Sequence, residues 1–417
     1  MPGICDPAAP SGVRIRPTRD ALIRHSINQP MFASLALVVL AGLLGPLLAA
    51  GRKPLVPVLV GELIAGAFLG RTGIHFIHPS VQPFPAFMSL GFAMLMLGAG
   101  TEVDLGSKQL RGGAIRGAVA LLVTLAVSVP LGIAFGIVLQ AGHLQLLIVL
   151  LAGSSAAVAF PIIQERGLDG PAVAVLIAWM TLADALTALL MPLTLSGSGR
   201  IPAAILGDGL IIVVAAGAVA LGRRFFQTPL ADEAKGESKH RSWALQLRIS
   251  VLLLLALSAI SESTGASLLL AGFAAGIVLR QFHEPHRLVH QLTGLATGFF
   301  VPAFFVLLGA TLDIRSLVNS PSAIAVAVAM ATGATAVHLL ASLATSRYQK
   351  LASGLLAAAQ LGLPAAAAAL GLASGALTPP LAAALVAGGC LTLIPASIGA
   401  AMLASKPGAK GTSAESR

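Results

Sequence analysis

The sequence predicts an all-α integral membrane protein of about thirteen transmembrane helices, arranged as inverted repeats with two crossed, discontinuous helices. Three observations predict this class. First, 56% of the 417 residues are hydrophobic and only 10% are charged, whereas about a quarter of a soluble chain is charged. Second, apolar runs of membrane-spanning length recur along the chain. Third, two sets of short motifs repeat in the same order in its two halves.

The apolar runs place the spans, because a bilayer core needs about 20 apolar residues per helix. The expected spans are near 31–50, 54–70, 85–101, 117–140, 145–163, 171–196, 201–222, 247–261, 264–280, 293–312, 321–344, 351–373 and 378–403. Residues 1–30 and 404–417 are predicted to be disordered tails, and 31–403 the membrane domain. The first span ends in "LLAAGRK", as a signal sequence can, but its length favours a retained helix.

Lysine and arginine set the orientation, because cytoplasmic loops carry the excess of both. With thirteen spans, nineteen of the 26 basic residues lie on the side opposite the N-terminus. Six of them are in the polar connection 223–248, which we expect to be cytoplasmic. The prediction is an N-terminus outside, a cytoplasmic C-terminus and a bacterial inner (plasma) membrane location. Four arginines before the first span oppose this orientation.

Composition also excludes several kinds of function. The net charge of +10 comes from basic residues scattered between apolar runs, which indicates membrane orientation and no nucleic-acid partner. Cys5 and Cys390 lie at opposite ends of the chain and support neither a disulfide framework nor a metal cluster. Acids, histidines and cysteines form no cluster near one interface, so the sequence does not predict an enzyme.

Two motifs repeat. "MLMLGAGTEVDL" (94–105) is echoed by "FVLLGATLDI" (305–314), and "IAGAFLG" (64–70) by "LAGFAAG" (270–276). The copies are seven spans apart, an odd number, so they have opposite orientations in the membrane. Inverted repeats are typical of secondary transporters, which bind substrate near the midplane between the halves. The predicted division is repeat one at about 31–196, a linker helix at 201–222, the loop 223–248 and repeat two at about 249–403.

Spans five and twelve occupy matching places in the two repeats, and each carries a proline and glycines near its middle. Span five reads "LLIVLLAGSSAAVAFPIIQERGL", with Pro161, and span twelve reads "GLLAAAQLGLPAAAAALGLASG", with Pro364. A membrane proline produces either a simple kink or a broken helix whose freed carbonyls and half-helix ends coordinate ions. The matching positions favour broken helices.

Four motifs carry a family resemblance: "VGELIAGAFLGRTGI" (60–74), "SSAAVAFPIIQERGL" (154–168), "LADALTALLMPL" (182–193) and "FFVPAFFVLLGATLDI" (299–314). In this order they resemble the monovalent cation/proton antiporters of the CPA2 branch, over about 31–403. The resemblance implies a mobile core domain, a dimer-forming domain and hence a homodimer. It also implies a role in pH homeostasis, with a monovalent cation, a proton and membrane lipid as partners and no cofactor.

The resemblance further implies that a membrane-embedded aspartate binds either a cation or a proton, and Asp184 occupies that position. A charge at the bilayer centre costs several kcal/mol and marks ion pathways. Asp184 is either a protonated carboxyl bonded within the bundle or the carboxylate from which Na⁺ or K⁺ displaces a proton. Ser154, Ser155 and Thr181 are candidate oxygen ligands beside it, or else they serve in helix packing.

The sequence departs from the family at three places. Electrogenic relatives carry two adjacent acids, whereas this chain has Ala183 before Asp184, which favours electroneutral exchange. His338 stands where many relatives have a membrane lysine; it either pairs with Asp184 at acid pH or is neutral and bonded to a backbone carbonyl. Gln360 lies near a family glutamate position, and an amide ligates a cation without carrying a proton. Glu62, in the family's "GEL", is expected to bond across helices or to modulate transport.

Two other functions stay open. One is a sodium-coupled organic-anion symporter, which shares the broken-helix architecture. The other is a degenerate relative that has lost transport. The sequence does not distinguish which cation is carried, nor the direction of flux.

Overall fold

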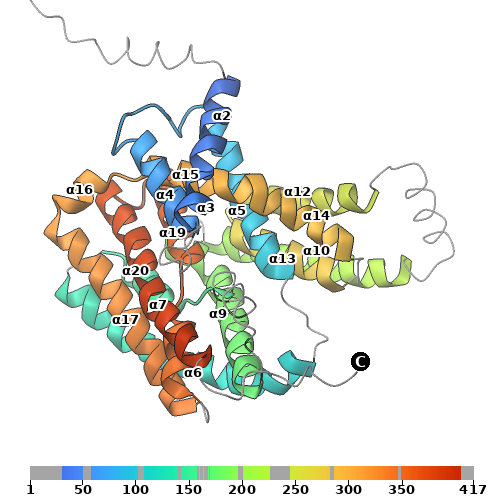
Figure 1. Cartoon of the computed structure of the whole chain (residues 1–417). Helices are drawn as coiled ribbons and strands as arrows, with labels where there is room; N and C mark the ends of the chain where they lie inside the picture. Colours follow the sequence, from blue (N-terminus) through green and yellow to red (C-terminus); the bar gives the residue numbers. More distant parts are fainter. Residues whose placement is uncertain are drawn as a thin grey trace, which may run out of the picture.

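The computed structural model describes residues 31–49, 58–101, 108–139, 142–156, 159, 163, 168, 170–195, 201–225, 245–281, 286–345 and 349–404. Every regular element in these ranges is helical (Figure 1). Nine of the described helices are long and apolar enough to cross a membrane, and three shorter ones are also apolar. The predicted all-α membrane class is therefore confirmed. The count of thirteen stays a prediction, because part of span five lies outside the described residues.

The helices follow the predicted spans in order. They are α2 (Met31–Gly42), α3 (Leu44–Ala49), α4 (Val58–Leu69), α5 (Phe84–Thr101), α6 (Lys108–Val138), α7 (Leu144–Ala152), α9 (Pro171–Leu195), α10 (Ile201–Phe225), α12 (Leu245–Thr264), α13 (Leu268–Gln281), α14 (His286–Leu295), η1 (Ala296–Phe300), α15 (Val301–Thr311), α16 (Ile314–Val318), α17 (Pro321–Thr345), α18 (Lys350–Ala357), α19 (Gly362–Ser374) and α20 (Pro379–Ala404). Both predicted tails, and most of the predicted loop 223–248, lie outside the described residues.

Three spans differ from their predicted form. The first is interrupted at Leu43, between α2 and α3. The fourth starts earlier, because the polar residues that open α6 at Lys108 lower its hydropathy without stopping the helix. The tenth contains a π-helical turn, η1, in which Val301 N–H bonds to the carbonyl of Ala296. Pro302 follows directly; it lacks an N–H and crowds the preceding turn, which accounts for the widening.

The repeated motifs pack reciprocally. Helix α4 packs against α15, and α5 packs against α13, so each motif helix of one half contacts the complementary motif helix of the other. Corresponding glycines allow this approach. A Cβ at Gly66 would clash with the carbonyl of Val306, and one at its counterpart Gly272 with the carbonyl of Ala93. This exchange of partners is the packing expected of two copies related by a two-fold axis.

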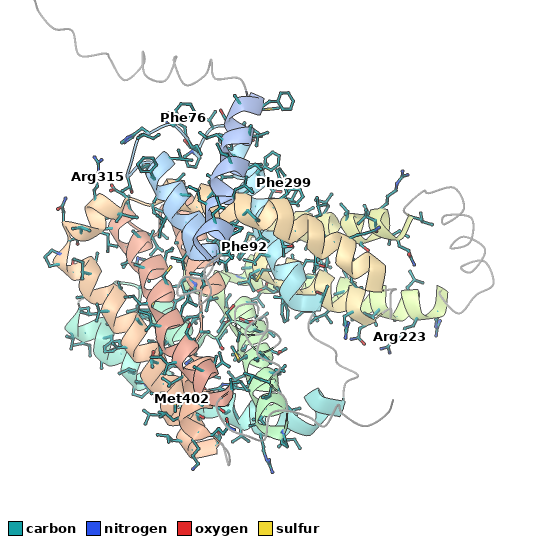
Figure 2. All side chains as sticks on the ribbon, viewed as in Figure 1. Phe76, Phe92, Arg223, Phe299, Arg315 and Met402 are labelled. Atoms are coloured by element: carbon teal, nitrogen blue, oxygen red, sulfur yellow. The ribbon has the colours of Figure 1, made fainter. Side chains whose placement is uncertain are left out.

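Most of the other helices belong to one packed group. Helices α6, α7, α9, α17, α18, α19 and α20 pack on one another, and Figure 1 shows α6, α7, α17 and α20 gathered on one side. On the other side, α10 joins α9 to α12 and α13. In Figure 2, Phe92 marks the meeting of α5 with α15, where its ring lies 5.3 Å from that of Phe304, and Arg223 marks the outer end of α10.

Candidate functional site

The interruption after α7 (residues 153–156) and the interruption between α18 and α19 (residues 358–361) lie against each other among α6, α9, α17 and α20, and we call this region the crossing. Helix α7 ends at Ala152, and the chain continues in extended conformation through Gly153, with φ −66° and ψ 146°. Helix α18 ends at Ala357, and α19 begins only at Gly362. The interruptions predicted for spans five and twelve are therefore present.

Hydrogen bonds join one interruption to the other. Ser155 N–H donates to the carbonyl of Ala359 at 2.7 Å. The hydroxyl of Ser154 donates to the carbonyl of Ala357, also at 2.7 Å. Both carbonyls belong to the break after α18, where the helix no longer supplies their usual donors. Ser154 and Ser155 thus satisfy the backbone of the opposite broken helix.

Helix α9 brings Asp184 to the crossing. Its Oδ2 accepts a hydrogen bond of 2.7 Å from the backbone N–H of Ala156, immediately after the extended stretch of span five. The Asp184 side chain is half-buried. Thr181 precedes it by three residues, one turn earlier on the same face of α9, and is buried. Asp184, Ser154 and Ser155, singled out from the sequence, therefore meet in one place.

Gln360 lies in the break between α18 and α19. Its backbone N–H donates to Oγ1 of Thr392 at 3.1 Å, and Thr392 itself bonds to the carbonyl of Gly389 at 2.7 Å. The threonine anchors the break to α20. Sequence reasoning missed Thr392, although a hydroxyl in the middle of the apolar run 378–403 was a signal for it. The side-chain amide of Gln360 is fully buried.

His338 is fully buried on α17. Its Nδ1 donates to the carbonyl of Ala334 at 2.8 Å, and its ring stacks on Trp179 at 5.4 Å. The indole of Trp179 donates to Oγ1 of Thr124 at 3.1 Å. Among the described residues no hydrogen bond or ion pair joins His338 to Asp184. The geometry matches the expectation of a histidine bonded to a backbone carbonyl.

The other predicted residues lie outside the crossing. Glu62 is buried on α4, whose partners include α3 and α15. Its Cγ lies 2.8 Å from the position that a Cβ of Gly45 in α3 would take. Pro364 is the third residue of α19, where a proline is tolerated, so the break precedes it. Pro161 lies outside the described residues.

Asp313 closes the loop after α15. Its carboxylate accepts from the N–H of Ser316 at 2.9 Å and caps α16. These bonds with Ser316, followed by Arg71 and Arg315 nearby, hold the pKa of Asp313 below its usual range. The residue is a helix cap, as its place at a span end suggests.

Chemically, the crossing presents oxygen atoms. The Asp184 carboxylate, the serine hydroxyls and the carbonyls of the broken helices are the ligand type that hard cations prefer. A carboxylate also accepts a proton. A site of this kind can therefore hold a small cation or a proton within an apolar bundle.

Comparison with known proteins shows the family. The family described as sodium/hydrogen exchanger, transmembrane, matches residues 35–406. The chain is 29% identical to the putative Na⁺/H⁺ antiporter YjbQ of Bacillus subtilis (strain 168) over 315 residues, which cover 68% of this chain and 48% of that protein. It is 26% identical to the glutathione-regulated potassium-efflux system protein KefC of Cronobacter sakazakii (strain ATCC BAA-894), over 63% of this chain and 42% of that protein. The chain thus spans about half the length of these curated relatives.

A solved structure supports the fold. The sodium proton antiporter MjNhaP1 from Methanocaldococcus jannaschii superimposes with a TM-score of 0.58 at 18% identity, over 92% of this chain and 100% of that one. At this identity the likeness concerns the fold alone. The family match covers nearly all of the membrane domain, and the chain therefore belongs to the sodium/hydrogen exchanger family.

Proposed function

We propose that this protein exchanges a monovalent cation, Na⁺ or K⁺, for protons by alternating access around Asp184. The observation that carries the proposal is the position of Asp184, whose Oδ2 bonds to the backbone at the crossing of two broken helices. The names of relatives support both cations: YjbQ is named a Na⁺/H⁺ antiporter and KefC a potassium-efflux protein.

One carboxylate gives exchange a simple electrostatic basis. With a proton or with a monovalent cation, the Asp184 site is neutral, whereas empty it carries a charge that is costly within the bilayer. The site can therefore change sides of the membrane when it holds a proton or a cation, but not when it is empty. This restriction couples the proton flux to the cation flux. Ala183 adds no second charge. Exchange is then one for one and electroneutral.

The hydrogen bonds define what each ligand contributes. The N–H of Ala156 fixes Oδ2 of Asp184. The hydroxyl proton of Ser154 is already donated to Ala357, so this residue offers a cation only the lone pairs of its oxygen. Ser155 and Thr181 are the other candidate oxygen ligands. We place the protein in a bacterial inner membrane as a homodimer, with its N-terminus outside.

The test is dissipation of an imposed pH gradient in proteoliposomes containing the full chain, with Na⁺, K⁺, Li⁺ or choline added. We expect at least one of the three metal cations to dissipate the gradient and choline to have no effect. Imposing a potassium–valinomycin potential at fixed pH gradient should leave the rate of Na⁺ or Li⁺ exchange unchanged.

A failure of all three metal cations would contradict the proposed exchange, and together with no uptake of an organic anion it would identify a degenerate relative. Sodium-driven uptake of an organic anion without proton movement would identify a symporter. A clear dependence of the rate on the imposed potential would contradict electroneutrality alone.

A further inference from the structure

Among the described residues, the side-chain amide of Gln360 has no hydrogen-bond partner. Gln360 is 0% exposed, and in the described part of the chain neither its Oε1 nor its Nε2 forms a hydrogen bond. A buried polar group without a partner is destabilising, and such groups are uncommon in folded proteins. Its backbone, by contrast, is bonded to Thr392. The main chain of this break is therefore held firmly while the amide is left with unused bonding capacity.

The amide lies at the crossing. Its Oε1 is 3.1 Å from the position that a Cβ of Gly153 would take, so the absence of a side chain at Gly153 makes room for it. Gly153 opens the extended stretch that ends at Ala156, and the N–H of Ala156 holds Asp184. Gln360 and Asp184 therefore border the same four-residue segment of span five, one at each end.

A methionine of α5, Met96, lies beside the start of α19, two residues after Gln360. A Cβ at Gly362, just after Gln360, would lie 3.4 Å from Cε of Met96 on α5 and 4.0 Å from Oγ of Ser155. Met96 is itself buried. Its thioether is a weak acceptor, so the oxygens of the crossing are the stronger ligands at this position.

We propose that Oε1 of Gln360 is a ligand of the transported cation, acting together with the Asp184 carboxylate. The inference rests on the proposed function and adds a division of roles to it. An amide oxygen attracts a metal cation but does not titrate. Gln360 therefore strengthens cation binding without taking part in proton binding, and it sets the cation concentration at which the two ions compete equally for Asp184.

The experiment compares wild type with Gln360→Met and Gln360→Glu, using the purified full chain. Methionine keeps an unbranched side chain of similar length and removes the two unpaired polar atoms. Thermal unfolding is measured in choline chloride and again with NaCl, KCl or LiCl, because a ligand that binds only the folded state raises its stability. Exchange in proteoliposomes gives the apparent cation affinity and its pH dependence.

In choline, Gln360→Met should unfold at or above the wild-type temperature, since replacing an unpaired buried polar group with an apolar one is neutral or stabilising. The rise in unfolding temperature produced by the preferred cation should be lost. Apparent cation affinity should fall about tenfold, on the scale of one contact to a charged group, whereas the pH below which protons begin to weaken that affinity should be unchanged. Gln360→Glu keeps an oxygen in place and should retain the cation-induced rise, while its added charge makes exchange sensitive to voltage.

Ser258→Ala is the matched control. It removes an unpartnered buried hydroxyl from α12, outside the crossing, and should change neither the cation-induced rise nor the affinity. An unchanged cation response in Gln360→Met, or a lower unfolding temperature in choline, would overturn the inference. If wild type exchanges cations, Asp184→Asn does not, and Gln360→Met has wild-type affinity, only this inference fails. If wild type exchanges none of the three cations, the proposed function fails and this inference with it.

Discussion

The contact between α5 and α13 and the crossing of α7 with α18 and α19 are both built from small residues, yet they use their backbones differently. At the first, Gly276 lets two continuous helices touch, and a Cβ there would lie 2.7 Å from Cα of Gly100. At the second, the helices are interrupted and their free carbonyls bond to Ser154 and to the backbone of Ser155.

The different use of the backbone suits the α5–α13 contact to rigid packing and the crossing to ion binding. Continuous helices satisfy their backbone groups internally, so small residues between them gain only close packing. Interrupted helices present oxygens and amides that need partners. In the described residues the crossing holds both the backbone-bonded carboxylate of Asp184 and the unpartnered amide of Gln360. The glycine-packed pairs are thus suited to a fixed frame, and the crossing to ion binding.

Gly276→Ala should produce the largest loss of stability. Its Cβ would clash with the carbonyl of Leu97, and backbone on both sides leaves nothing flexible to move. Overpacking of this kind costs about 1–3 kcal/mol, which should lower the unfolding temperature of the purified protein. Gly98→Ala on α5 is the control, because its Cβ would meet no atom within 4 Å. Equal unfolding temperatures in the two variants would contradict close packing of α5 against α13.

Ser154→Ala should have a smaller effect, localised at the crossing. It removes the hydrogen bond to Ala357 and leaves that carbonyl without its donor, at a cost of about 1 kcal/mol. Ser128→Ala is the control, since the buried Ser128 hydroxyl bonds within its own helix, to Leu125. The unfolding temperature and the exchange rate should both be lower in Ser154→Ala than in wild type, and both should stay near the wild-type values in Ser128→Ala. The opposite ranking would show that the two broken helices are held together by other contacts.

His338→Phe should have the smallest effect on transport. Phenylalanine keeps the stack on Trp179. It removes Nδ1, which bonds to the carbonyl of Ala334 in the same helix, and Nε2, which has no partner among the described residues. Because no hydrogen bond or ion pair joins His338 to Asp184 among the described residues, the pH profile of exchange in His338→Phe should match that of wild type. A displaced pH midpoint would show that the histidine titrates together with the transport site. The transport site would then include His338 on α17 as well as Asp184.

Local pattern predicted much of this molecule. Hydropathy placed the helices, and the glycines of spans five and twelve indicated both breaks, because each depends on residues adjacent in the chain; Pro364 lies within α19, just after its break. The local sequence pattern could not predict contacts between distant segments. Nothing near Gln360 in the sequence indicates that Thr392 anchors its backbone, and nothing near His338 indicates its stack on Trp179. The lysine position occupied by His338 suggested a partner for Asp184, while packing directs the ring elsewhere.

The π-helical turn was also not predicted. Pro302 was visible in the sequence, but a proline in a span is compatible with a kink, a break or a widened turn. The bond from Val301 to Ala296 shows which of these occurs. The turn packs on α5, and no hydropathy pattern reports that contact.

The most direct test of the central claim is the pH dependence of cation affinity in wild type and Asp184→Asn. If a proton and a cation compete for Asp184, wild-type affinity should weaken about tenfold per pH unit on the acid side of the midpoint, the slope for one competing proton. Asp184→Asn keeps an acceptor for Ala156 N–H and should fold but exchange nothing. Asp208→Asn is the control: Asp208 is a buried membrane carboxyl that accepts from the backbone N–H of Ser267 outside the crossing, and its variant should still exchange. Exchange by Asp184→Asn at the wild-type rate would contradict the account.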